Sequence, residues 1–292
     1  MKKKFILGIG SQRAGSTFIT RLLNQHQKIA IHPLKELHYF DTIFGLRGEN
    51  VLKDFSRNQL NREINKLCDS RNLDFVSSSW KWYLRTNLKL YNTPVADIQY
   101  FDLFSDIKDV DSVEFTGEST PEYMLLDKHQ IKKMKATINN AYVIIICRNP
   151  VKRIISSFRL LLEYGNHEQI RSNRECDQLF LKLIEKDDIW IQRQILYGDY
   201  EKAIKNYSNF FNRVLFLSYD DIVESPQNII TNLSKFLDLD FQSPTMLNFF
   251  KRKINPLSIK YNPGKEIISQ LETLLEEQNT ATSNLFAKNL KF

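Results

Sequence analysis

The stretch Gly10-Ser11-Gln12-Arg13-Ala14-Gly15-Ser16-Thr17 decides the fold of this 292-residue chain. It follows an apolar run at residues 5–9 and precedes apolar positions with helical spacing at residues 18–23. A strand, a glycine loop and a helix in this order present backbone N–H groups and the positive end of the helix to a phosphate. We therefore expect an anion-binding loop at residues 10–17.

The glycine spacing is that of a nucleoside-triphosphate P-loop, G-x-x-x-x-G-K-[ST], but the lysine of that motif is missing. Ser16 occupies the lysine position, and Arg13 is the only cation in the loop. The loop therefore lacks the side chain that usually contacts the β- and γ-phosphates. This departure favours an activated anion other than ATP.

Length and composition set broad limits. The chain is long enough for one large α/β domain or two small ones, and we predict a single domain over residues 1–292. The formal net charge of +7 favours anionic ligands without identifying them. Three scattered cysteines predict no disulfide framework and no metal site, and no apolar run is long enough to span a membrane. The apolar run after Lys2-Lys3-Lys4 is too short for a signal peptide, so we expect a cytoplasmic protein.

Strand-like and helix-like runs alternate along the chain. The predicted strands cover residues 5–9, 29–31, 112–116, 142–147 and 214–217. Helical periodicity appears at residues 18–23, 151–162, 228–237 and 267–275. This alternation predicts an α/β fold, with a P-loop-like parallel sheet of about five strands flanked by helices on both faces. Ligands of such sheets bind at the carboxyl ends of the strands.

A second cationic turn follows the fourth predicted strand. Arg148 ends the apolar run, Pro150 suits the first turn of a helix, and Ser156 lies about two turns into that helix. The forked donors of an arginine and a nearby hydroxyl can bind a phosphate. The alternative is that Arg148 and Arg153 are surface charges and that Ser156 has no special role.

These features together resemble the sulfotransferases that use 3′-phosphoadenosine 5′-phosphosulfate (PAPS). Residues 12–17 resemble the family's 5′-phosphosulfate loop, and Arg148 with Ser156 resembles its 3′-phosphate motif. Lys35-Glu36-Leu37-His38-Tyr39-Phe40 is similar to the Glu-Val-His-Phe-Phe of carbohydrate sulfotransferases, including those acting on heparan sulfate. Residues 117–123, Gly-Glu-Ser-Thr-Pro-Glu-Tyr, are similar to their Glu-Lys-(Thr/Ser)-Pro-x-Tyr.

The resemblance implies a reaction and roles for particular residues. The expected function is in-line transfer of a sulfuryl group from PAPS to a hydroxyl of a carbohydrate or small metabolite, leaving 3′-phosphoadenosine 5′-phosphate. Glu36 is the expected base, Arg13 binds the transferred group or bridging oxygen, and His38 is either a catalytic helper or a structural hydrogen-bonder. Ser119 stands where the heparan-type relatives have lysine, which argues against a polyanionic acceptor.

The predicted cofactor site combines both anion motifs with a C-terminal segment, residues 253–265, that resembles the family's mobile cover. Its expected residues are Gln12, Arg13, Ala14, Gly15, Ser16, Thr17, Arg148, Ser156, Lys260 and Lys265.

The aromatic-rich stretch at about residues 69–112 is predicted to be a helical insertion in this domain. Trp80, Trp82, Tyr91 and Tyr100 are expected to wall the acceptor pocket together with Glu36 and His38, because rigid rings suit sugars and flat small molecules. The alternative is that these aromatic residues merely pack on the domain.

Two other functions remain open from the sequence alone. One is a P-loop phosphotransferase that uses ATP, against which Ser16 argues. The other is a non-enzymatic binder of nucleotides or nucleic acid, suggested only by the net charge. The chain has no RNA-recognition or helix-turn-helix signature, so we expect no nucleic-acid partner.

Overall fold

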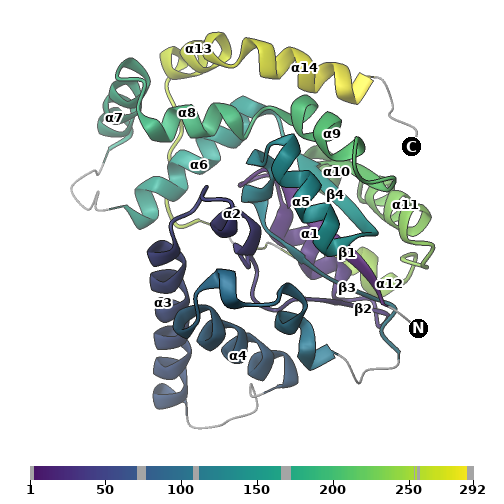
Figure 1. The fold of residues 1–292 in the computed structure, drawn as a ribbon. Coiled ribbons are helices and arrows are strands. Elements are labelled where there is room, and N and C mark those ends of the chain that lie inside the picture. Colours follow the sequence, from purple (N-terminus) through teal and green to yellow (C-terminus); the bar gives the residue numbers. More distant parts are fainter. Residues whose placement is uncertain are drawn as a thin grey trace.

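A sheet of five parallel strands, in the order β2-β3-β1-β4-β5, forms the centre of the protein (Figure 1). The computed structural model describes residues 3–70, 77–107, 112–165, 172–252, 254 and 257–287. The strands are β1 (Lys4–Gly10), β2 (Ile29–Ile31), β3 (Phe115–Ser119), β4 (Ala141–Cys147) and β5 (Val214–Ser218). The predicted α/β fold with a parallel sheet is confirmed.

Helices connect these strands and cover both faces of the sheet. The α-helices are α1 (Ser16–Leu23), α2 (Tyr39–Ile43), α3 (Glu49–Asp69), α4 (Ser78–Asn92), α5 (Lys128–Ile138), α6 (Pro150–Tyr164), α7 (Asn173–Glu185), α8 (Ile189–Leu196), α9 (Tyr200–Ser208), α10 (Tyr219–Glu224), α11 (Pro226–Leu237), α12 (Pro244–Phe249), α13 (Lys265–Leu274) and α14 (Glu276–Ala287). The 3₁₀ helices are η1 (Val95–Asp97), η2 (Tyr100–Ile107) and η3 (Pro121–Leu125).

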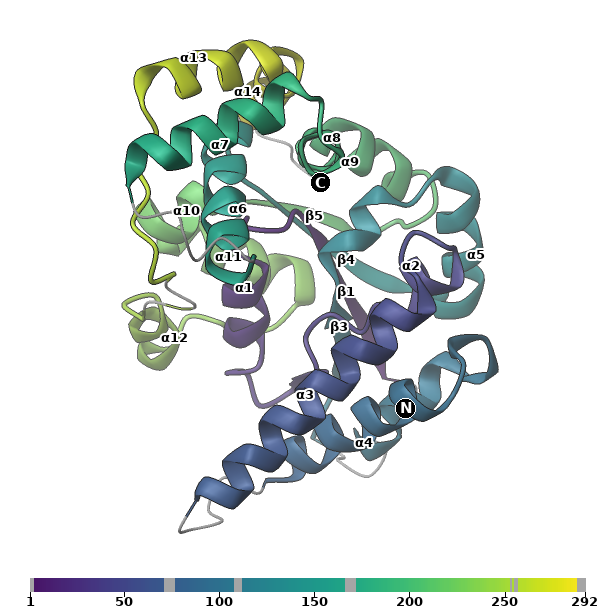
Figure 2. The ribbon, with the colours of Figure 1, turned by 90° about the vertical axis from the view of Figure 1, so that its left-hand side faces the viewer.

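Alternate side chains of the strands enter two different cores. Ile6 of β1 and Ile144 of β4 pack with α1, α11 and α12, whereas Leu7 and Val143 pack with α5, α9 and η2 on the other face. Figure 2 shows the sheet between these two layers of helices. Because both faces are covered, every residue of β4 is buried, as expected for a parallel strand with an unbroken apolar sequence.

A third apolar cluster lies beyond the carboxyl ends of the strands and joins α6, α7, α8 and α13. Its centre is the stacked pair Phe158 and Phe180, with ring centroids 4.1 Å apart. Helices α13 and α14 lie over the outside of α6 in Figure 1, and both contact it. This cluster therefore fixes α6, which carries Ser156, at the edge of the sheet where ligands of such folds bind.

The structure changes the predicted limits of two regions. The third strand was predicted at residues 112–116 but occupies Phe115–Ser119, where its backbone pairs with β1 from Lys4 to Gly8. Gly117 lies inside this strand, where an added Cβ atom would stand 1.9 Å from the oxygen of Ile6 on β1. The helical region predicted from residue 69 begins earlier, at Glu49, where α3 starts and runs beside α4 (Figure 2). Parts of the predicted insertion, residues 71–76 and 108–111, lie outside the described residues.

Candidate active site

The loop between β1 and α1 is built to present backbone N–H groups. Arg13 and Gly15 adopt the left-handed backbone conformation, with φ of 68° and 94°, and no side chain caps the first turn of α1. Uncapped N–H groups at a helix start, together with the helix dipole, attract an anion. Gly15 is also required by packing, since a Cβ atom there would lie 2.9 Å from the ring of Tyr219.

The two anion motifs of the sequence are in direct contact. Arg13 donates from Nε to the hydroxyl of Ser156 at 3.1 Å, and Arg148 donates from Nη1 to the backbone oxygen of Arg13 at 3.0 Å. The Arg148 guanidinium also lies over the ring of Tyr219, 4.2 Å from its centroid. The structure therefore brings Arg13, Arg148 and Ser156 into contact, whereas the motifs predicted two separate anion sites, and it orients the Arg13 side chain toward α6.

These arginines are positively charged groups without a matching anion. Burial, and for Arg13 also the charge of Arg148, lowers the pKa of both side chains from the usual arginine value, although the charge of Glu163 offsets part of this for Arg13. Neither forms an ion pair with a carboxylate in the described part of the chain. Arg148 Nε is buried and has no hydrogen-bond partner among the residues that the structure describes. An unsatisfied charged donor is costly, so these residues fit a bound phosphate or sulfate.

Arg153 is not the surface charge that one interpretation of the sequence allowed. It is fully buried and links α6 to α8, because Nη1 donates to the side-chain oxygen of Gln194 at 2.8 Å and Nη2 donates to its backbone oxygen. It adds positive potential behind Arg148 without reaching the surface.

The two C-terminal lysines predicted to contact the cofactor, Lys260 and Lys265, are exposed. Tyr261 beside them is buried, accepts a hydrogen bond from Arg159 of α6 at 2.8 Å through its backbone oxygen, and donates to Asp177 at 2.6 Å. Tyr261 therefore holds this part of the segment against α6, while residues 253, 255 and 256 lie outside the described residues. A contact between either lysine and a cofactor stays a prediction.

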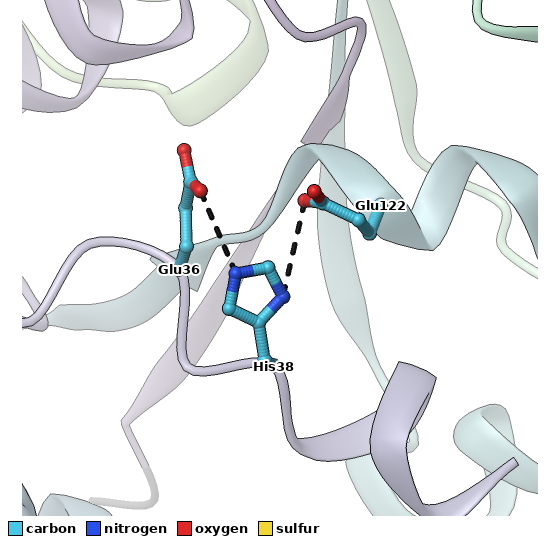
Figure 3. A group of neighbouring side chains, drawn as sticks. All are labelled: Glu36, His38 and Glu122. Carbon is cyan, nitrogen blue, oxygen red and sulfur yellow. Dashed lines mark ion pairs between the residues drawn. The ribbon is translucent and has the colours of Figure 1, made fainter. Parts of the chain in front are cut away.

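A second group of charged residues surrounds His38, which is buried just before α2 (Figure 3). His38 donates from Nδ1 to Asp41 at 2.8 Å, and its Nε2 lies 3.6 Å from Glu36. Glu122, from η3, approaches Nδ1 at 3.9 Å. Three carboxyl groups therefore face one imidazole, from the loop before α2, from α2 and from η3.

Neighbouring charges set the ionisation of this group. Burial alone would lower the pKa of His38, but its hydrogen bond to Asp41, the nearby Glu36 carboxylate and the charge of Glu122 raise it to about 9. Burial would likewise raise the pKa of Glu36, but Lys35, 2.5 Å away, and His38 hold it below its usual value. At neutral pH, His38 is therefore an imidazolium and Glu36 a carboxylate.

Sequence reasoning assigned no role to Asp41, Arg47, Glu122 or Tyr197. Arg47 bridges Asp41 at 3.2 Å and Glu122 at 3.3 Å, while burial and the charge of Glu36 raise the pKa of Glu122. The position of Asp41, three residues after His38, is a signal that the sequence contains. Nothing in the sequence indicates that residues 47 and 122 meet.

Tyr197 connects the two groups. Its backbone oxygen accepts a hydrogen bond from Ser11 of the anion loop at 2.8 Å. Burial and the nearby charge of Glu122 raise the pKa of its phenol. The anion loop and the His38 group are thus neighbouring parts of one site.

Glu36, His38 and Glu122 also offer ligand atoms within 4.8 Å of one another, close enough to hold a metal ion together. The sequence predicted no metal site, because its spacing does not show that Glu122 joins the other two residues. A metal ion would have to displace the proton that His38 shares with its carboxylate neighbours.

The four aromatic residues predicted to wall the acceptor pocket are not gathered around Glu36. Trp82 and Tyr100 belong to the core, with exposed fractions of 6% and 2%, and their polar atoms donate to the Leu103 oxygen and to Glu118. Trp80 donates to Glu63 on α3, and Tyr91 is exposed. An acceptor contact by these residues stays a prediction, and the burial of Trp82 and Tyr100 leaves them little surface for it.

Comparison with known proteins identifies the family. The sequence profile described as "Sulfotransferase family" matches residues 5–243, which include both groups of site residues. The chain belongs to the sulfotransferase family. The resemblance found in the motifs is therefore confirmed.

Two solved structures and one curated protein illustrate the similarity. The crystal structure of a sulfotransferase from Alicyclobacillus acidocaldarius is 19% identical, with a TM-score of 0.52 over 94% of this chain and 96% of the other. The sulfotransferase domain of the Synechococcus PCC 7002 olefin synthase is 20% identical, with a TM-score of 0.43 over 93% and 94%. The similarity to the Alicyclobacillus structure supports the shared fold.

A curated relative from Dictyostelium discoideum, the membrane-associated sulfotransferase kil1, is 20% identical over 156 residues. The match covers 53% of this sulfotransferase and 22% of the relative's length. In the part of the chain that the structure describes, no helix is long and apolar enough to cross a membrane.

The raised pKa of His38 predicts how stability changes with pH. The folded protein keeps a proton on His38 up to about pH 9, whereas the unfolded chain loses it near pH 6.5. The resulting stabilisation is complete below pH 6.5 and is lost as the pH rises through 9, and it amounts to about 3 kcal/mol at most. Urea unfolding of the wild type and His38→Gln should therefore give a stability difference that shrinks from pH 6 to pH 9.5. A difference independent of pH would contradict this ionisation.

Proposed function

We propose that this sulfotransferase moves a sulfuryl group from PAPS to a hydroxyl group of a carbohydrate or small-molecule acceptor. The observation that carries the proposal is the pairing of desolvated, unneutralised arginines with a neighbouring carboxylate–imidazolium group at one edge of the sheet. The first group suits a donor with several anionic centres, and the second suits a hydroxyl that must lose a proton.

The anion loop and Arg148 would hold the donor. The N–H groups of residues 15–17 and the Arg13 side chain would bind the 5′-phosphosulfate, whereas the Ala14 N–H already donates to the Ser11 oxygen; Arg148 and Ser156 would bind the 3′-phosphate. When bound, PAPS supplies the activated sulfuryl group. Arg13 already contacts Ser156, so a phosphate that takes over the Ser156 hydroxyl would free Arg13 to turn toward the transferred group.

Glu36 would accept the acceptor's proton. As the acceptor oxygen forms a bond to sulfur, the bond from sulfur to the bridging oxygen breaks, and its electron pair leaves on 3′-phosphoadenosine 5′-phosphate. The hydroxyl proton becomes strongly acidic as the new bond forms, so even a carboxylate with a lowered pKa can take it. His38 already carries a proton at neutral pH and therefore acts by orienting Glu36 rather than as the base.

The acceptor half of the site suits an acceptor without many negative charges. Asp41 and Glu122 lie close to Glu36 and His38, and Ser119 supplies no cation where heparan-type relatives have lysine. We propose a neutral carbohydrate or small metabolite as acceptor. A cytoplasmic location agrees with the three free cysteines, two of which are buried.

Arg148→Ala tests the 3′-phosphate contact. The change removes a charge-assisted hydrogen bond worth about 1.5–3 kcal/mol, so the affinity for 3′-phosphoadenosine 5′-phosphate should fall by about one to two orders of magnitude. Lys152→Ala is the matched control, because it removes the same charge from an exposed position in the first turn of α6, four residues further along the chain. Calorimetric titration should show a large loss for the first variant only. Equal affinities in both variants would remove Arg148 from the site.

Glu36→Gln tests the base. The protein is incubated with PAPS and a panel of sugars, alcohols and tyrosine peptides, and products are detected by a mass increase of one sulfuryl group. With any acceptor found, turnover by Glu36→Gln should fall by about 10²- to 10⁴-fold, while the affinity for 3′-phosphoadenosine 5′-phosphate stays near that of wild type. Glu114→Gln is the control, because Glu114 also pairs with a lysine but lies before β3, at the opposite edge of the sheet. A Glu36→Gln enzyme with the wild-type rate would place the base elsewhere.

A further inference from the structure

The loop that carries Glu36 and His38 is held in an unfavourable backbone conformation. Both residues have positive φ angles, 70° for Glu36 and 52° for His38, which side chains other than glycine rarely adopt. Such a conformation persists only when surrounding contacts determine it. Backbone contacts on both sides of the strained residues come from one short segment, residues 119–123, at the end of β3 and the start of η3.

This segment anchors the loop on both sides of the strained residues. Before them, the N–H of Glu36 donates to the backbone oxygen of Ser119 at 3.1 Å. After them, the N–H groups of Tyr39 and Phe40 donate to the phenol oxygen of Tyr123, at 3.1 and 3.4 Å. Tyr123 is fully buried, so these N–H groups have a fixed partner in place of water.

The Tyr123 phenol oxygen caps the N-terminus of α2. Tyr39 and Phe40 are the first two residues of α2, whose N–H groups have no partner inside the helix. His38 is the residue at the cap position, but its side chain makes no capping bond and instead contacts Asp41 and Glu36. The Tyr123 phenol therefore leaves the imidazole free for the active site.

Glu118 sets the direction of the Tyr123 proton. This buried carboxyl group accepts hydrogen bonds from Tyr123 at 3.1 Å, from Tyr100 at 2.6 Å and from the Thr120 hydroxyl at 2.7 Å. Since the phenol proton points to Glu118, the lone pairs of the Tyr123 oxygen are left to accept from α2. A chain of hydrogen bonds thus runs from Glu118 through Tyr123 to the residues that follow His38.

We propose that Tyr123, oriented by Glu118, is a positioning residue for sulfuryl transfer: it caps α2 from a neighbouring element and thereby fixes His38 against Glu36. Neither residue reaches the reacting atoms. The kinetic part of this proposal rests on the proposed role of Glu36, whereas the structural part concerns the loop alone.

Tyr123→Phe is the test, because it removes the capping oxygen and keeps the ring. NMR titration should show the pKa of His38 falling from about 9 toward the ordinary 6.5, as the imidazole loses its fixed place beside Glu36 and Asp41. With an acceptor in hand, kcat should fall by about ten- to a hundredfold, with little change in the affinity for 3′-phosphoadenosine 5′-phosphate.

Thr120→Val is the matched control. It also removes a buried hydroxyl that donates to Glu118. Within the described residues, however, the Thr120 hydroxyl forms no hydrogen bond to α2. The pKa of His38 and the turnover of this variant should stay near those of wild type. Equal effects of both substitutions, or no change of the His38 pKa in Tyr123→Phe, would overturn the proposal.

If Tyr123→Phe does not fold, amide hydrogen exchange on the wild-type protein tests whether Tyr123 caps α2. The Tyr39 and Phe40 amides should exchange slowly, although the first amides of a short helix are normally unprotected. Fast exchange at both would overturn the capping role. Because the titration and the exchange need neither donor nor acceptor, they remain decisive if 3′-phosphoadenosine 5′-phosphate fails to bind and the proposed function is wrong.

Discussion

Positive charge that forms no ion pair with a carboxylate of the described residues is the constraint on which the donor half of this site depends. Arg13 and Arg148 are largely removed from water, repel each other, and contact mainly neutral groups, namely a hydroxyl, a backbone oxygen and an aromatic ring. Behind them Arg153 is fully buried on Gln194. Desolvated cations lower the stability of the ligand-free protein, and a bound anion would offset this cost. These arginines lie at the edge of the sheet where parallel sheets bind ligands.

The acceptor half shows the opposite arrangement, in which each charge has a partner. Lys35 pairs with Glu36, His38 with Asp41, and Arg47 with both Asp41 and Glu122. This balance keeps Glu36 ionised and His38 protonated before any substrate arrives. The two halves meet through Tyr197, which touches the anion loop with its backbone and lies near Glu122 with its phenol. The donor half therefore needs a bound anion to balance its arginines. The acceptor half already has its charges paired, with Glu36 ready to accept a proton.

The sequence predicts well those parts of the protein whose structure or role depends on residues close together in the chain. The loop of residues 10–17, Arg148 with Ser156, and the five strands are signalled by neighbouring residues, and the structure places all of them at one sheet. Contacts between distant segments are not signalled locally. Glu122 contacts His38 because β3 lies beside β2 and brings the segments that follow both strands together. The end of β3 is polar, so the sequence indicated neither the limits of that strand nor the hydrogen bonds of Glu118. Aromatic richness around Trp82 and Tyr100 was ambiguous because core packing and ligand binding select the same residues.

The most direct test of the account is a calorimetric comparison of two nucleotides that differ only in the 3′-phosphate, without added Mg²⁺. Binding that depends on the unneutralised charge of Arg148 should make 3′-phosphoadenosine 5′-phosphate bind about ten- to a hundredfold more tightly than adenosine 5′-monophosphate. The preference should shrink as the salt concentration rises. Equal affinities for the two nucleotides would contradict the account, because the buried arginines would then have no phosphate to neutralise them.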